Sequence, residues 1–350
     1  MSRWLLIATA MFWHGSLAWG QSAADNPGKG DLLSPVRPTP GQAEGTRPPP
    51  PPSDQMASLG KPGWSVSEPS GCWVWNPFPN ADEHVTWSGG CKEDRADGEG
   101  IAVWTYKKEE EIRSERYEGG YRSGKPHGYG RLFLANGNRY EGNFEDGQRT
   151  GYGVFIWADG ERYEGDFRDG DRHGYGFYVW KNGNTYGGRY EHGKRTGRGT
   201  FIWANGDRYD GDFWDGERHG RGVMVWADGD RYEGEYRDDK RTGYGIYTWS
   251  NGNRYEGDFL KGERTGHGVY AWADGNRYEG DFLKGKRHGK GTFVWADGGR
   301  YEGGYRDNLP HGNGKYFNAQ SGWFVGNWRH GCLARGKDII ALGRPLSECR

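Results

Sequence analysis

The sequence predicts an all-β fold: an elongated, curved and twisted single-layer antiparallel meander of stacked 23-residue β-hairpin repeats. Three observations predict it. Glycine and aromatic residues dominate the composition, with 64 Gly, 18 Trp and 22 Tyr in 350 residues. A Tyr-Glu-Gly triplet, or a close variant, recurs every 23 residues. Within each interval, apolar and charged residues alternate with the period of two that is typical of β-strands.

The composition limits both the kind of core and the class of partner. Hydrophobic residues make up only 33% of the chain, so we expect a thin aromatic core in which each unit packs on its neighbours. The 47 basic and 48 acidic residues give a net charge of −1. No region concentrates positive charge as nucleic-acid-binding proteins do, so we expect no nucleic-acid partner.

Residues 1–20 have the pattern of a signal peptide. Arg3 precedes the apolar run from Trp4 to Trp13, and Ala18-Trp19-Gly20 resembles a cleavage site. The apolar run is short for a membrane span, although a retained anchor or a buried helix is the alternative. There is no cysteine near the cleavage site, so a lipid-anchored form is not expected. The sequence therefore predicts an exported protein, in the periplasm or outside a bacterial cell.

Residues 21–63 form a proline-rich segment that includes Pro48–Pro52 in succession. This composition has too little apolar surface to fold and favours extended polyproline II structure, so a disordered linker is expected. The proline-rich segment has two interpretations: it is either a ligand for a proline-recognition domain or a spacer. For an exported protein the spacer is favoured.

The repeat itself explains the expected strands and turns. The triplet begins at Tyr117, Tyr140, Tyr163, Tyr186, Tyr209, Tyr232, Tyr255, Tyr278 and Tyr301. In the third copy, Tyr163, Gly165 and Phe167 share one strand face, and charged residues share the other. Asp169-Gly170 predicts a turn into a return strand, and Asn182-Gly183 predicts the next turn. Glycines among the aromatic residues leave slots for rings from facing strands.

These residues carry a family resemblance. The run Tyr-Glu-Gly-Asp-Phe, followed by Asp-Gly, Arg-His-Gly and Trp-Ala-Asp-Gly, resembles the MORN (membrane occupation and recognition nexus) repeat, here of a bacterial exported type. The resemblance covers Tyr117 to about Asn318. It implies one hairpin per repeat, stacked into a curved sheet with an aromatic-lined inner surface. We therefore expect nine repeats over 117–323.

The flanking regions are expected to cap the array. Residues 64–116 contain a degenerate copy beginning at Trp87, separated by 30 residues from Tyr117, with the excess in Lys107–Glu115. Residues 324–350 contain a partial repeat and a second cap. Terminal units of repeat arrays are atypical because they must close an open end.

All four cysteines, Cys72, Cys91, Cys332 and Cys349, lie in or beside these caps. An even number in an exported chain favours disulfides. Of three possible pairings, the local ones, Cys72–Cys91 and Cys332–Cys349, are expected. Nine hairpins span on the order of 85 Å, whereas a disulfide needs Cα atoms within about 7 Å. A metal site is the alternative, but there is no Cys-x-x-Cys pair.

Residues that attract attention as catalysts recur in phase with the repeat. One repeat position holds histidine in five copies and threonine in the other four; the histidines are His127, His173, His219, His288 and His311. Two residues after the recurring arginine, the repeats have a carboxylate, as at Glu141, Glu164 and Glu256. Recurrence favours structural roles. The residues that break the pattern, Thr185, Gly187, Pro126 and Pro310, do not combine a nucleophile, a base and an orienting group. We expect no enzyme activity, cofactor or metal site.

The leading functional hypothesis is a scaffold that binds a partner protein or an extended polymer through an aromatic and glycine-lined surface. The candidate binding-surface residues are Tyr140, Phe144, Trp157, Tyr163, Phe167, Trp180, Tyr209, Phe213, Trp226, Tyr232, Tyr255, Trp272, Tyr278 and Trp295.

The alternative hypothesis is peripheral binding to anionic phospholipid through a row of repeated arginines. These candidate lipid-facing residues are Arg149, Arg172, Arg195, Arg218, Arg241, Arg264 and Arg287. Self-association of the open sheet is a third hypothesis.

Overall fold

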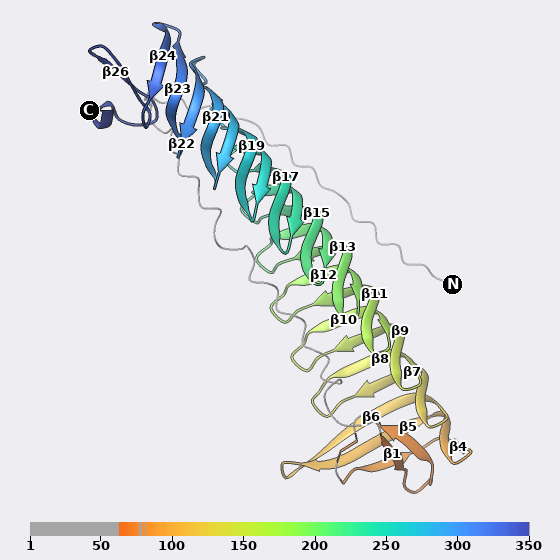
Figure 1. Ribbon diagram of the computed structural model, residues 1–350. Helices are drawn as coiled ribbons and strands as arrows, with labels where there is room; N and C mark the ends of the chain where they lie inside the picture. Colours follow the sequence, from red (N-terminus) through yellow and green to blue (C-terminus); the bar gives the residue numbers. More distant parts are fainter. Residues whose placement is uncertain (1–62, 77–78, 81, 350) are drawn as a thin grey trace, which may run out of the picture.

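The computed structural model describes residues 63–76, 79–80 and 82–349, so the predicted signal peptide and most of the proline-rich linker lie outside the described residues. Figure 1 shows a long, twisted array whose strands lie across its long axis. Strands β5 to β24 pair antiparallel in sequence order. The predicted all-β meander is confirmed. Within the described ranges, no helix is long and apolar enough to cross a membrane.

Each repeat contributes one short strand and one longer return strand. The short strands are β8 (Arg139–Glu145), β10 (Arg162–Arg168), β12 (Thr185–Glu191), β14 (Arg208–Trp214), β16 (Arg231–Arg237), β18 (Arg254–Leu260), β20 (Arg277–Leu283) and β22 (Arg300–Arg306). The return strands are β7 (Lys125–Phe133), β9 (Gln148–Ile156), β11 (Asp171–Val179), β13 (Lys194–Ile202), β15 (Glu217–Val225), β17 (Lys240–Thr248), β19 (Glu263–Ala271), β21 (Lys286–Val294) and β23 (Leu309–Asn318).

The turn inside each hairpin requires two left-handed residues. Asp169 and Gly170 connect β10 to β11 with φ angles of 51° and 86°. Two successive residues with positive φ are what a two-residue turn of type I′ needs, and its twist matches that of the flanking strands. The predicted Asp-Gly turn is confirmed.

Glycine pairs allow the tyrosine rings to lie flat on the sheet. Gly165 pairs with Gly176, and a register shift follows between Gly165 and Phe167. A Cβ atom on Gly176 would lie 2.4 Å from the ring of Tyr163, so only glycine leaves room for that ring. The predicted slots are therefore filled by a tyrosine of the same hairpin.

The core consists of two parallel rows of rings that run along the array. The first, the Tyr–Phe ladder, is continuous from Trp87 to Trp328: Tyr163, for example, meets Phe167 at 5.1 Å and Tyr190 of the next repeat at 5.3 Å, both edge-on. The second, the Trp ladder, runs from Phe155 to Phe324, with Met224 in place of one ring. The edge-on contacts of the Tyr–Phe ladder add to the stabilisation from burial.

The N-terminal cap closes one end of the core. It comprises β1 (Gly63–Val66), β2 (Trp73–Asn76), β3 (His84–Trp87), β4 (Gly90–Lys92) and β5 (Arg95–Lys108). Here β2 makes a parallel pairing with β5, a departure from the antiparallel meander. Trp87 covers Gly100 as Tyr163 covers Gly176. The excess residues before Tyr117 lengthen the hairpin between β5 and β6 (Glu111–Arg122), which projects at the lower end of Figure 1.

The C-terminal cap closes the other end. It comprises β24 (Gly322–Trp328), β25 (Cys332–Arg335), β26 (Asp338–Ala341) and the 3-10 helix η2 (Leu346–Cys349). Both predicted disulfides are confirmed, with Cα–Cα distances of 5.7 Å for Cys72–Cys91 and 5.5 Å for Cys332–Cys349.

Candidate binding surface

The aromatic residues predicted to line an open binding surface are in the core, so that prediction needs correction. Eleven of the fourteen are buried: Tyr140, Phe144, Trp157, Tyr163, Phe167, Trp180, Tyr209, Phe213, Tyr232, Tyr255 and Tyr278. The other three, Trp226, Trp272 and Trp295, are half-buried and pack against them. The two ladders meet where the rings of Tyr163 and Tyr178 lie 6.4 Å apart, and the register shift beside the glycine pair is an irregularity of the kind that bends a strand. These rings stabilise the array and do not face a ligand.

The repeated arginines are also buried, which contradicts the predicted lipid-facing row. Their exposed fractions run only from 4% to 7% for Arg149, Arg172, Arg195, Arg218, Arg241, Arg264 and Arg287. The Arg172 guanidinium carbon lies 5.8 Å, 5.4 Å and 5.5 Å from the ring centres of Tyr163, Tyr178 and Tyr190. Each arginine thus lies between the ladders, where ring faces attract the cation.

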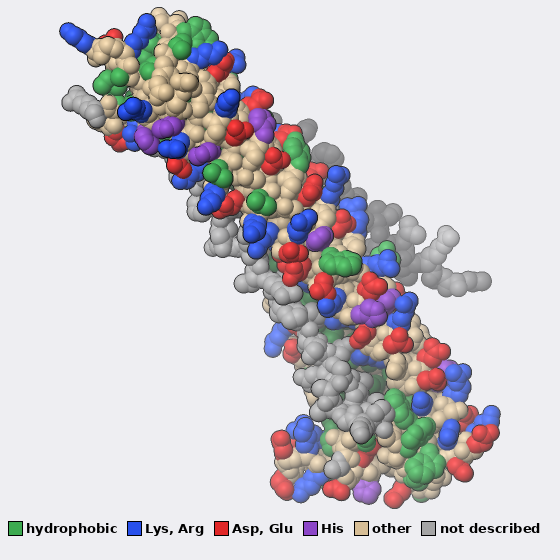
Figure 2. Space-filling view, in the orientation of Figure 1, with side chains coloured by type: hydrophobic (Ala, Val, Ile, Leu, Met, Phe, Trp, Pro, Cys, Tyr) green, Lys and Arg blue, Asp and Glu red, His purple; other side chains and the backbone are tan. Residues whose placement is uncertain are grey.

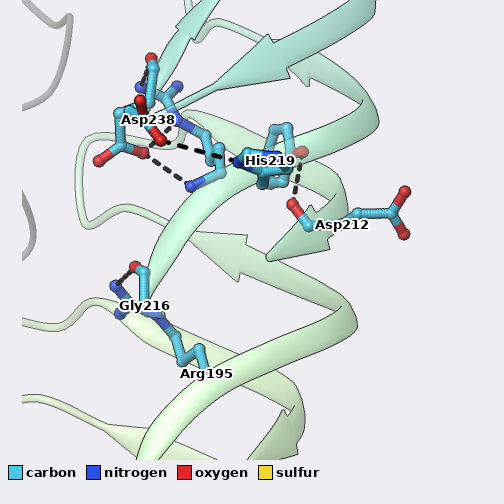
Figure 3. Close-up of polar contacts among 8 residues, drawn as sticks. Arg195, Asp212, Gly216, His219 and Asp238 are labelled. Carbon is cyan, nitrogen blue, oxygen red and sulfur yellow. Dashed lines mark hydrogen bonds and ion pairs between the residues drawn. The ribbon is translucent and has the colours of Figure 1, made fainter. Parts of the chain in front are cut away.

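The buried arginines connect neighbouring repeats. Arg172 donates from Nη2 to the Gly193 carbonyl at 3.0 Å, and the Gly193 N–H donates to the Arg172 carbonyl at 2.9 Å. Figure 3 shows the equivalent contact of Arg195 with Gly216. Burial lowers the pKa of the Arg195 guanidinium. The row ends at each side in a buried proline, Pro126 and Pro310.

The surface opposite the ladders, here called the strand face, carries the charged residues that alternate with the core tyrosines. Arginine–carboxylate ion pairs recur along it as Arg162–Glu164, Arg208–Asp210, Arg231–Glu233, Arg254–Glu256, Arg277–Glu279 and Arg300–Glu302. This confirms the predicted face of alternating charge. Figure 2 shows both signs interspersed along the visible side, without a continuous region of one sign.

Three exposed aromatic rings interrupt this charge in consecutive repeats. Tyr129, Tyr152 and Tyr175 occupy the thirteenth position of their repeats on β7, β9 and β11, with exposed fractions of 56%, 53% and 71%. We call them the tyrosine row. The later repeats have Arg198, Arg221, Tyr244, His267, Lys290 and Asn313 at this position. The row is therefore a local feature that the array does not require.

Sequence reasoning missed the tyrosine row, although a signal was present. Alternation places Tyr175 on the charged side of the strand that buries Tyr178. An aromatic residue that varies between repeats and lies on the solvent side indicates a surface role more than a core role.

Two members of the row are hydrogen-bonded to carboxylates of the following repeat. The Tyr129 hydroxyl donates to Glu141 and the Tyr152 hydroxyl donates to Glu164. These bonds raise the pKa of both tyrosines and lower the pKa of both glutamates, because a carboxylate anion is the better acceptor. Tyr244, outside the row, makes the same bond with Glu256.

Tyr175 differs because the corresponding acid is absent. Gly187 stands where the other repeats have Glu or Asp, and Thr185 stands where they have arginine. In the described part of the chain, no hydrogen bond from the Tyr175 hydroxyl is found. Phe177, 44% exposed, extends over Gly187 instead. The two pattern-breaking residues therefore leave an uncharged strip of Phe177 and Gly187 next to Tyr175, bordered by Arg189 opposite Tyr175 and by Glu164 opposite Phe177.

The histidines lie near the hairpin turns. His219 Nδ1 is 3.8 Å from Asp238, and the rings of His173 and His192 are 6.0 Å apart. Figure 3 marks the contact between His219 and Asp238. Among the residues that the structure describes, no group of three or more His, Cys, Asp or Glu side chains is arranged to hold a metal ion.

Comparison with known proteins identifies the repeat. The family model described as MORN repeat matches residues 117–139, 140–162, 163–185, 186–208, 209–231, 232–254, 255–277, 278–300 and 301–319. A search of the curated proteins found no match. Each matched segment begins at a tyrosine of the Tyr–Phe ladder, so one segment is one hairpin and its connection to the next. Since the matches span more than half of the chain, the chain belongs to the MORN repeat family.

Proposed function

We propose that this protein is a non-catalytic, exported scaffold that binds an extended partner, a protein segment or a polymer, across its strand face. MORN repeats are in general binding scaffolds. The observation that carries the proposal is the tyrosine row. Exposed aromatic rings cluster there without a packing role, and tyrosine is a common anchor in binding surfaces.

The array suits an extended ligand because its surface repeats at a fixed distance. Tyr129, Tyr152 and Tyr175 lie on alternate strands, so successive rings are separated by about 9–10 Å. A ligand running across β7, β9 and β11 therefore meets a tyrosine ring at each step. The strands hold the rings in place before binding, which limits the conformational entropy lost in the complex.

The two disulfides support the exported location, because such bonds persist in oxidising compartments. Burial of the arginine row removes the chemical basis for its binding to lipid headgroups. Sedimentation with anionic liposomes at two salt concentrations tests the membrane alternative separately. A salt-sensitive pellet would replace the protein-partner proposal with a membrane one.

The direct test is capture of partners by chemical cross-linking in the medium that surrounds the exporting cell. A variant with Tyr152→Ser and Tyr175→Ser is expected to lose the partners that the parent protein captures. Tyr244→Ser is the matched control, since Tyr244 is 52% exposed at the same repeat position but lies apart from the row. Equal capture by all three proteins would contradict the proposal.

A further inference from the structure

We propose that the tyrosine row is a polyproline II binding site, and that its occupant is the proline run of the same chain, Pro48–Pro52. This inference rests on the proposed binding role of the strand face and names the chemistry of the ligand. Four features carry it: the spacing of the rings, the free donor of Tyr175, the uncharged strip beside it and the length of the connecting chain.

The spacing of the row matches one turn of polyproline II. Such a helix has three residues per turn and rises about 3.1 Å per residue, so equivalent residues recur every ~9.3 Å. Tyr129, Tyr152 and Tyr175 recur every second strand, at about 9–10 Å. A proline helix lying along the array therefore places every third residue against a tyrosine, and the five residues of Pro48–Pro52 are long enough to meet two neighbouring rings.

The chemistry of the row also fits. A polyproline II chain has no internal hydrogen bonds, so its carbonyl groups need donors, while its proline rings pack on aromatic faces. The hydroxyls of Tyr129 and Tyr152 are engaged with carboxylates that hold the two rings in place. Tyr175 has the hydroxyl that is available to donate to a carbonyl of the ligand.

The uncharged strip of Phe177 and Gly187 favours an apolar ligand next to Tyr175. Elsewhere, an arginine and an acid flank the tyrosine position, as in the Arg162–Glu164 pair. At Gly187 both are missing, and Phe177 provides an exposed ring beside Tyr175. A proline ring that packs on Phe177 and Gly187 covers no ion pair of β12, whose desolvation would be costly, and the charged residues Arg189 and Glu164 lie at the borders of the strip.

The proline run is within reach of the row. Pro52 precedes Gly63, the first residue of β1, by 11 residues, which extend to at most about 36–40 Å. The hairpin of β1 and β2 contacts the turn before β7, since the Trp75 N–H donates to the Gly124 carbonyl at 2.8 Å. Tyr129 follows Gly124 by five residues along β7, so the two residues are about 17 Å apart.

A peptide titration tests the ligand chemistry. The full chain with Pro48–Pro52 replaced by alternating Gly and Ser leaves the row vacant, and a fluorescent peptide of residues 44–55 is then added. We expect anisotropy to show binding that Tyr175→Ala weakens about tenfold and that Tyr244→Ala leaves unchanged. The parent chain should bind the peptide about tenfold more weakly than the vacant variant, since its own run competes.

Chemical nitration tests docking within one chain. Tyr175 is expected to react more slowly in the parent than in the vacant variant, whereas Tyr244 should react at the same rate in both. Equal rates for Tyr175, or a peptide that binds the parent and the vacant variant equally, would overturn the inference.

These results also separate the inference from the proposed function. If the peptide does not bind, but capture of external partners still depends on Tyr175, only the assignment of the occupant is wrong. If Tyr175→Ala changes neither peptide binding nor partner capture, both are wrong.

Discussion

Arg172 and Gly193 exchange two hydrogen bonds across the junction between consecutive repeats, one from the guanidinium and one from the glycine N–H. The same arginine contacts rings of both ladders. Arg172 thus connects three parts of the array: its own hairpin, the turn of the next hairpin and the aromatic core. It explains why arginine recurs at a buried position.

Arg172→Lys should destabilise the array by about 2 kcal/mol. Lysine keeps the charge but lacks the planar group that stacks on rings while donating to Gly193. The measurement is the shift in the urea midpoint followed by tryptophan fluorescence. The exposed Arg168 provides the control, since Arg168→Lys should leave the midpoint unchanged. Equal midpoints for both variants would show that the buried contacts contribute nothing.

Gly222→Ala should cost about 1–3 kcal/mol because of overpacking. A Cβ at Gly222 would lie 2.4 Å from the Tyr209 ring, which the hairpin holds in place through a bond from its hydroxyl to the Asp212 carbonyl. Gly90→Ala is the matched control, with the nearest atom at 3.6 Å. Thermal unfolding of both variants checks this. Comparable loss in the two would indicate a general effect of replacing strand glycines.

The array should lose stability at alkaline pH. Burial raises the pKa of Tyr190 to about 12 and raises that of Tyr163 and Tyr209 well above 10.0. Because the folded state has the higher pKa, this contribution is complete below pH 10 and declines as pH rises through the folded values. Phenolate absorbance and circular dichroism should therefore change together at high pH. Ionisation of all tyrosines near pH 10 with unchanged dichroism would contradict this.

Removing the C-terminal disulfide should loosen only that end. With Cys332→Ser and Cys349→Ser, the cap should lose about 3 kcal/mol, the value expected for a loop of this length. Hydrogen exchange should accelerate in β24 but not in β15, since each repeat contacts mainly its neighbours. The corresponding change at Cys72 and Cys91 should affect the opposite end. Uniformly faster exchange would show that the array unfolds as one unit.

Gly187→Glu should leave folding intact and reduce partner capture. A Cβ at Gly187 would meet Phe177 at 3.4 Å, an ordinary contact. The new carboxylate would accept from the Tyr175 hydroxyl, as Glu164 does from Tyr152, and would add charge to the strip. Capture at the parent level, with unchanged thermal stability, would show that the strip is not part of the binding surface.

Local interactions account for what could be predicted from the sequence. The period of 23 residues, the Asp-Gly turns and the alternation within β10 follow from backbone geometry over a few residues. The local disulfides follow from the length of the array, which separates its ends.

For the repeats, the sequence by itself therefore determined the strands, their order and the side chains that share each face, whereas the parallel pairing of β2 with β5 in the cap was not predicted. Only the tertiary structure decided which face is covered. Alternation groups Tyr163 with Phe167 but does not say that a register shift follows Gly165 or that both rings are buried. For the same reason, Arg172 is an interior residue and Tyr175 an exposed one. Burial depends on how successive hairpins stack, which no single repeat contains.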